Sequence, residues 1–250
     1  MKFLKTVFHV HTDYSDDSDN SIEHLIESAE QSGVHCLAIT DHDSIAGARA
    51  LAKAAGTNLK VIVGEEISTA QGHLIGLFLT ERIRPGMSVR DTAQAIKKQG
   101  GLVVVPHPFN VLFDCGLRRF VHQIVDLIDI VEVANAQNLL PFPNIRAARF
   151  ARQHALPALV GVDTHHRGSL GACYQWLEPF DGPVSFLEAT RQAKLVHARH
   201  TLRYFARAAV VIVRSRLGLA LPERYGRHCT SSRHDHLGRT PGTSIQTEES

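Results

Sequence analysis

The sequence predicts a single α/β domain built around a parallel β-sheet. Short apolar runs alternate with helical patterns through residues 1–195, as they do in repeated β–α units. The run Leu-Val-Val-Val at residues 102–105 is typical of a strand buried on both faces. The chain has 250 residues and 44% hydrophobic content, which suits one barrel-sized domain with a full core.

Strands and helices follow one another in a regular order. Seven apolar runs are expected to form strands, at residues 6–10, 36–40, 59–67, 73–79, 102–105, 130–133 and 158–162. Five helices are expected between and after them. The first is capped by Asn20 with Glu23 and ends before Gly33, and the third runs from Ser88 with Asp91 to the Gly100-Gly101 stop. The other three are expected over 45–55, 144–154 and 183–195. Residues 69–72 predict a hairpin loop, which would introduce one antiparallel step.

The end of the chain differs from the rest. Residues 167–183 have no clear period, and residues 196–221 predict a basic C-terminal helix with arginines at 199, 203, 207 and 214. Residues 222–250 are rich in Ser, Thr, Arg, His and Gly, a composition that predicts a disordered tail. The predicted organisation is therefore a barrel domain over 1–195, a helix over 196–221 and a tail over 222–250.

Composition argues against several classes of partner. The net charge of +2 gives no bulk electrostatic case for nucleic-acid binding. The apolar stretch from 206 to 221 is interrupted by arginines, so no membrane span is expected. Four scattered cysteines and a short, charged N-terminus without an apolar signal region predict a cytoplasmic protein with free thiols.

Nine side chains with metal-type donors lie at the ends of predicted strands. They form five clusters: His9 and His11 with Asp16, His42, Glu66 with His73, His107, and Asp163 with His165. Imidazole nitrogen and carboxylate oxygen are donors that suit Zn²⁺, Mn²⁺ and Fe²⁺. Nine donors are too many for one ion, so we expect two or three divalent ions.

Spacing supports some of these candidates more strongly than others. Residues two apart in a strand face the same side, so His9 and His11 can reach one ion, as can Asp163 and His165. Pro106 and Pro108 would stiffen the backbone on either side of His107. Strand parity leaves open which of Glu65 and Glu66 faces the centre.

Three further residues are expected to support the site. Asp41 and Asp43 flank His42 and are interpreted as residues that orient imidazoles or tune a bound water. Asp43 has the alternative role of capping the helix over 45–55. His166 is interpreted as a supporting residue or a substrate contact.

In this order, the motifs resemble the polymerase and histidinol phosphatase (PHP) family of metal-dependent phosphoesterases. They are His-Val-His-Thr at 9–12, Ser15-Asp16, Ile-Thr-Asp-His-Asp at 39–43, Gly-Glu-Glu-Ile-Ser at 64–68, His73, Pro-His-Pro at 106–108, the segment 132–138 and Gly-Val-Asp-Thr-His at 161–165. The resemblance covers residues 5–195 and implies a distorted TIM-like barrel of seven βα units with a trinuclear site. It implies one ion on His9, His11, Glu66 and Asp163, a second on Asp16, His42 and His165, and a third on Glu66, His73 and His107.

These expectations favour a hydrolase that acts on a small phosphorylated substrate. Metal coordination lowers the pKa of water towards about 7, so hydroxide would be available to attack a phosphate ester. Four arginines are candidate phosphate contacts: Arg118, Arg119, Arg146 and Arg167. Only 34 positions lead from His73 to His107, which leaves no room for a large cap domain there.

Three alternatives remain. A 3′–5′ exonuclease of the PHP type is the second hypothesis, although 6% aromatic content offers little for base stacking. An amidohydrolase-like C–N hydrolase also begins with a His-x-His strand, but nine donors exceed the number such a site needs. A metal-binding protein without catalytic activity is the least favoured.

Overall fold

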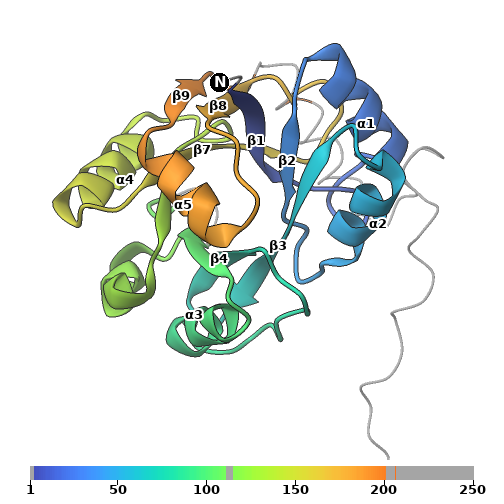
Figure 1. Ribbon diagram of the computed structural model, residues 1–250. Helices are drawn as coiled ribbons and strands as arrows, with labels where there is room; N and C mark the ends of the chain where they lie inside the picture. The colour runs from blue at the N-terminus through green and yellow to red at the C-terminus, as the bar shows by residue number, and fades with distance from the viewer. Residues whose placement is uncertain (1–2, 111–114, 201–205, 207–250) are drawn as a thin grey trace, which may run out of the picture.

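Seven strands close into a ring. The computed structural model describes residues 3–110, 115–200 and 206. The ring consists of β1 (Leu4–Val10), β2 (Cys36–Ile39), β3 (Lys60–Thr69), β4 (Gly72–Leu77), β5 (Leu102–Val105), β6 (Ile130–Asn135) and β7 (Ala158–Thr164). Each strand pairs with the next, and β1 pairs with both β2 and β7, which closes the barrel (Figure 1). The predicted distorted TIM-like barrel is confirmed.

One strand runs against the others. The pairs β1–β2, β2–β3, β5–β6, β6–β7 and β7–β1 are parallel, whereas β4 is antiparallel to β3 and β5. The predicted hairpin is confirmed, because Thr69 pairs with Gly72 across the turn. Since β4 is reversed, its first residues, and His73 among them, lie at the edge where the parallel strands end.

Helices cover the outside of the ring. α1 (Ile22–Gln31), α2 (Ala46–Ala55), α3 (Val89–Lys98) and α4 (Phe142–Gln153) follow strands in the predicted order, and the short 3-10 helices η1 (Arg118–Gln123) and η2 (Val125–Leu127) precede β6. Apolar residues on the outer strand faces, such as Val7, Leu37 and Val103, pack in two clusters with the helices.

The inside of the ring holds a third core. Phe8, Ala38, Ile62 and Val104 point inwards and pack with Phe186 of α5 (Pro183–Arg191). In Figure 1, α5 lies across the ring. The interior is therefore apolar near the strand starts, and polar donors are confined to the opposite, carboxyl end.

Two predictions about helices are corrected. The N-cap of α1 is Ser21, whose side chain accepts from His24 N, rather than Asn20. Asn20 instead donates through Nδ2 to the backbone oxygens of His11 (3.1 Å) and Thr164 (3.3 Å), and so joins the ends of β1 and β7. The last predicted helix stops at Arg191, because the chain turns there into a strand.

Two strands were not predicted. β8 (Cys173–Leu177) pairs antiparallel with the first half of β1, and β9 (Lys194–His197) pairs antiparallel with β8. Strand β9 takes the residues where the predicted basic helix would begin. The rest of that helix, at 201–205 and 207–221, and the predicted tail at 222–250 lie outside the described residues.

In the part of the chain that the structure describes, no helix has the length and apolar character needed to cross a membrane. The cytoplasmic location stays a prediction.

Candidate metal centre at the carboxyl end of the barrel

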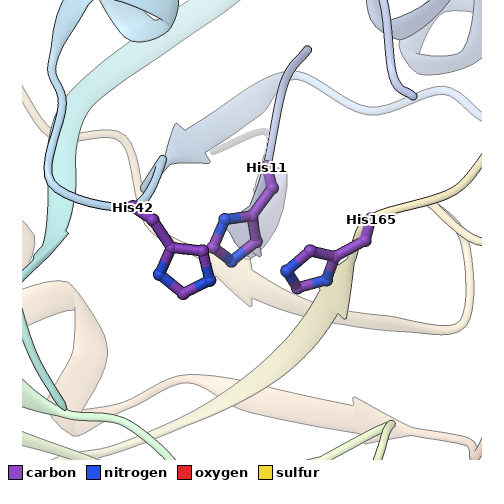
Figure 2. A group of neighbouring side chains, drawn as sticks. All are labelled: His11, His42 and His165. Carbon is purple, nitrogen blue, oxygen red and sulfur yellow. The ribbon is translucent and has the colours of Figure 1, made fainter. Parts of the chain in front are cut away.

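The carboxyl ends of the strands bring eight of the nine predicted donors together. The imidazoles of His11, His42 and His165 come from the ends of three different segments and point towards one another (Figure 2). The ring centroids of His11 and His165 are 4.0 Å apart, and those of His11 and His42 are 4.6 Å apart. Residues distant in the sequence therefore form one compact cluster.

Glu66 lies at the centre of this cluster. Its Oε2 is 3.0 Å from His9 Nε2, 3.3 Å from His11 Nε2 and 3.5 Å from His42 Nδ1. Its Oε1 is 2.9 Å from His73 Nδ1 and 3.0 Å from His107 Nε2. The two oxygens thus face two separate groups of histidines.

Glu65 points elsewhere. Its Oε2 accepts a hydrogen bond from Ile83 N at 2.8 Å, and burial raises its pKa to about 7. The choice that strand parity left open is therefore decided by position: Glu66, rather than Glu65, faces the histidines.

Asp163 forms the other side of the cluster. Its Oδ1 is 3.6 Å from His9 Nε2, 3.7 Å from His11 Nε2 and 3.5 Å from His165 Nδ1. Its Oδ2 accepts from Asn135 Nδ2 at 2.9 Å. One oxygen therefore faces the histidines while the other is held by the protein.

The backbone is unusual at three of these residues. His9, His107 and Asp163 have positive φ angles of 65°, 25° and 47°. The pairing of β1 with β2 shifts register between Val7 and Val10, so His9 lies in a bulge. Left-handed backbone at a residue other than glycine costs about 1–2 kcal/mol, and such strain is concentrated at functional sites.

The loop after β1 places a second acidic residue, Asp17, beside two of the histidines, and Asp16 as a ligand stays a prediction. Asp17 Oδ2 lies 3.5 Å from His42 Nε2 and 3.3 Å from His165 Nε2, and Asp16 and Asp17 are both exposed. Successive turns, with Ser15 N bonded to Thr12 O and Ser18 N bonded to Ser15 O, set this arrangement. The carboxylate beside these two histidines is therefore that of Asp17.

The pKa of His11 is shifted in the opposite direction from those of His9 and His42. Burial would lower the pKa of His9 and His42, but nearby carboxylates outweigh it and raise the pKa of His9 well above the ordinary value and that of His42 to about 9. Burial and the proximity of His165 lower the pKa of His11 to about 3. Burial would raise the pKa of Glu66, but His9, His42 and His73 hold it well below its usual range. Among His9, His11 and His42, His11 is therefore the one whose pKa is lowered, which favours its neutral form.

A buried carboxylate behind the cluster was not predicted from the sequence. Glu132 Oε1 is 2.9 Å from His9 Nδ1, and Oε2 accepts from His107 N at 2.6 Å and from Asn135 Nδ2 at 3.0 Å. A Cβ on Gly161 would lie only 1.5 Å from Glu132 Oε1, so this position leaves room for the carboxylate. The signal was an acidic residue inside the apolar strand Ile-Val-Glu-Val, which has to be paired when it is buried.

Asp41 and Asp43 have positioning roles in the structure. Asp41 accepts from Thr12 N (2.6 Å), Thr12 Oγ1 (2.8 Å) and Ser15 Oγ (3.0 Å), and Ser15 Oγ also lies 3.3 Å from His11 Nδ1. Burial raises the pKa of Asp41 to about 6. Asp43 accepts from Ser68 N at 2.8 Å and does not cap α2, whose N-cap is Ile45.

His166 and the four candidate arginines differ in burial and in their contacts. His166 is buried, with Nδ1 3.2 Å from Asp19 Oδ1. Arg118 and Arg119 are exposed in η1, and Arg167 is half-buried. Arg146 stacks its guanidinium 4.5 Å from the centre of the Phe109 ring, two residues beyond His107. Phosphate contacts by these arginines stay a prediction.

The donor set fits divalent metal ions. Two ligands of one tetrahedral ion lie about 3.3–3.6 Å apart when the bonds are ~2.0–2.2 Å long. The distances from the carboxylate oxygens of Glu66 and Asp163 to the histidine nitrogens range from 2.9 to 3.7 Å, a range that includes this separation. His11 Nε2 is buried and, among the described residues, has no hydrogen-bond partner. A neutral imidazole with an unused lone pair is the state that an ion requires.

The fold and the site define a class: an α/β barrel with a cluster of metal-type donors at its carboxyl end. The sequence matches the PHP domain over residues 8–144 and a PHP-associated region over residues 141–195. The chain belongs to the PHP domain family, and the resemblance inferred from its motifs is confirmed.

Individual proteins agree with this assignment. The chain is 37% identical over 147 residues to uncharacterized protein MJ1587 of Methanocaldococcus jannaschii. The aligned region covers 53% of this chain and 82% of that protein. Its fold is similar to a two-domain protein containing a predicted PHP-like metal-dependent phosphoesterase from Bacteroides vulgatus, with a TM-score of 0.65 and 17% identity, over 78% of this chain and 65% of that one.

Another similar structure is the lesion-specific endonuclease PfuEndoQ from Pyrococcus furiosus, with a TM-score of 0.57 and 13% identity, over 88% of this chain and 67% of that one. At these identities, the two structures establish similarity of fold alone.

Proposed function

We propose that this protein is a metal-dependent phosphoesterase that hydrolyses small phosphate esters. The observation that carries the proposal is Glu66, whose two oxygens face separate groups of histidines. A carboxylate placed in this way can bridge two ions. Clusters of this kind in PHP domains are associated with phosphoester hydrolysis, and the fold neighbour from Bacteroides vulgatus carries that description.

The distances support an assignment of ligands to three ion positions. His9, His11, Glu66 and Asp163 would hold one ion, and Glu66, His73 and His107 a second. His11, His42 and His165 have donor atoms within 4.8 Å of one another, and Asp17 is the carboxylate beside them. The ions we expect are Zn²⁺, Mn²⁺ or Fe²⁺, which accept imidazole and carboxylate donors.

Exposure indicates where substrate enters. The side chains of His42 and His73 are 26% and 22% exposed, whereas His9 is fully buried. The phosphate group therefore approaches from the side of His42 and His73. When bound, divalent ions supply an activated water and neutralise charge on the phosphoryl oxygens.

The protein's own residues hold this arrangement rigid. Glu132 fixes the ring of His9, Gln137 Nε2 lies 3.0 Å from His165 Nδ1, and Ser15 contacts His11. Such contacts orient ligands before an ion binds. Because an activated water would be the nucleophile, the reaction would need no covalent intermediate on the protein.

Activity on nucleic acid is the second candidate. The fold is similar to that of an endonuclease, and three of the four candidate arginines are exposed on η1 and α4. Small esters remain favoured because the net charge is only +2.

The test is hydrolysis by protein reloaded with Mn²⁺ or Zn²⁺. Substrates would be an aryl phosphate, a nucleotide, a single-stranded oligonucleotide and a cyclic amide. We expect phosphate release from the small esters, and a loss in His42→Ala larger than the ~10–100-fold typical of removing a residue behind a ligand. His24→Ala, on the outside in α1, is the matched control. Activity on the amide alone would refute the proposal.

A further inference from the structure

We propose that Cys115 is a positioning residue for the metal centre, and that its sulfur fixes the ring of His107. The inference rests on the proposed metal centre but concerns a residue that no sequence motif indicated. Cys115 Sγ lies 3.7 Å from His107 Nδ1, while Nε2 of the same ring lies 3.0 Å from Glu66 Oε1. The two nitrogens of one imidazole therefore have separate partners.

The position of Cys115 is fixed by the ligand-bearing strand. His73 N donates to Cys115 O at 2.8 Å, at the start of β4. A Cβ on Gly72 would come within 2.8 Å of that same oxygen, so glycine allows the close approach. Cys115 is thus tied through its backbone to His73 and through its sulfur to His107, which both face Glu66.

The chemistry follows that of His9. In His9, Nε2 faces Glu66 and Nδ1 is held by Glu132. In His107, sulfur takes the place of the carboxylate. When Nδ1 carries the proton and donates a hydrogen bond to the sulfur, the Nε2 lone pair is free for an ion. An ion on Nε2 also makes Nδ1–H a better donor, so the contact with a weak acceptor such as sulfur becomes stronger.

Direct ligation by sulfur is the competing arrangement. The donor atoms of His73, His107 and Cys115 all lie within 4.8 Å of one another, so geometry alone permits it. The sulfur, however, contacts Nδ1, and the two ring nitrogens point away from each other. An ion shared with Glu66 through Nε2 would therefore lie on the far side of the ring from the sulfur.

Metal titration of the full chain tests the proposal. Zn²⁺ affinities of the metal-stripped protein would be measured against a chromophoric chelator for wild type, Cys115→Ala, Cys115→Ser and Cys36→Ala. We expect Cys115→Ala to weaken one ion about tenfold, and Cys115→Ser, which keeps an acceptor, to lose less. Cys36 is buried at the start of β2, at the other end of the barrel, so its replacement should leave every affinity unchanged.

Two spectroscopic measurements make the outcome specific. In the Zn²⁺-loaded protein, the ring N–H proton of His107 should exchange faster with solvent in Cys115→Ala than in wild type. The Co²⁺-loaded wild type should show no sulfur-to-metal charge-transfer band in the near ultraviolet, and such a band would overturn the positioning role. Equal Zn²⁺ affinity in wild type and Cys115→Ala would overturn the inference alone, whereas failure of wild type to bind ions would overturn the metal centre as well.

Discussion

Replacing Gly161 by alanine should displace Glu132 and disturb the metal centre without touching a ligand. The new Cβ would lie 1.5 Å from Glu132 Oε1 and 2.6 Å from its carboxyl carbon. Ordinary contact begins at 3.4 Å, so the oxygen has to move by about 2 Å. The 2.9 Å contact with His9 Nδ1 cannot survive such a shift.

The size of the effect follows from the hydrogen bonds that this shift would break. Hydrogen bonds to charged groups contribute about 1.5–3 kcal/mol each. Breaking the bond to His9 and one of the other two that Glu132 accepts should cost about 3–6 kcal/mol, similar to removing one partner of a buried ion pair. The melting temperature of a domain of this size should fall by roughly 10 °C.

A double-mutant cycle isolates the mechanism. In the background of Glu132→Ala the clash is gone, so Gly161→Ala should cost less than about 1 kcal/mol. Urea unfolding in the presence of a chelator would give the free energies of unfolding. Gly171→Ala is the control, because its Cβ would meet nothing within 4 Å. An equal cost of Gly161→Ala in both backgrounds would show that the glycine does not act through Glu132.

Two further predictions concern the exposed side of the centre. Asp17→Asn should weaken metal binding by more than the ~10–100-fold typical of a residue behind a ligand, whereas Asp16→Asn should weaken it less; the opposite order in a chelator competition would favour Asp16 as the donor. In the metal-free protein, the raised pKa of His42 contributes stability that is fully present below pH 6.5 and is lost as pH rises through about 9. Urea unfolding between pH 6 and 10 should therefore show a fall of at most about 3 kcal/mol, and His42→Ala should flatten this fall.

The barrel could be predicted because its strands have strong local signals. β5 was predicted with its observed bounds, and the other ring strands to within a few residues at either end. β8 was missed although its residues alternate between buried and half-buried, the pattern of a strand with one buried face. β9 has only four residues and follows α5 closely, so its apolar residues resemble a continuation of that helix.

The donor cluster could be predicted as a set, but its internal geometry could not. Same-face spacing grouped His9 with His11, yet the structure brings them together through a bulge and a positive φ at His9. No sequence pattern shows where a bulge falls. Strand parity could not choose between Glu65 and Glu66, because adjacent residues face opposite sides and the sequence does not say which side is the centre. The approach of Asp17 to two histidines depends on two successive turns in the loop after β1, which a polar sequence does not specify.

The position of Glu132 indicates that the ion positions are coupled from behind as well as through Glu66. Its two oxygens contact His9 and the backbone of His107, which belong to different ion positions. Asn135 extends the link, because its Nδ2 contacts both Glu132 and Asp163. A shift of this one carboxylate therefore reaches ligands on β1, β7 and the end of β5 together. Replacing Glu132 by alanine should weaken two ions at once, whereas replacing Cys115, whose sulfur contacts the ring of His107, should weaken one.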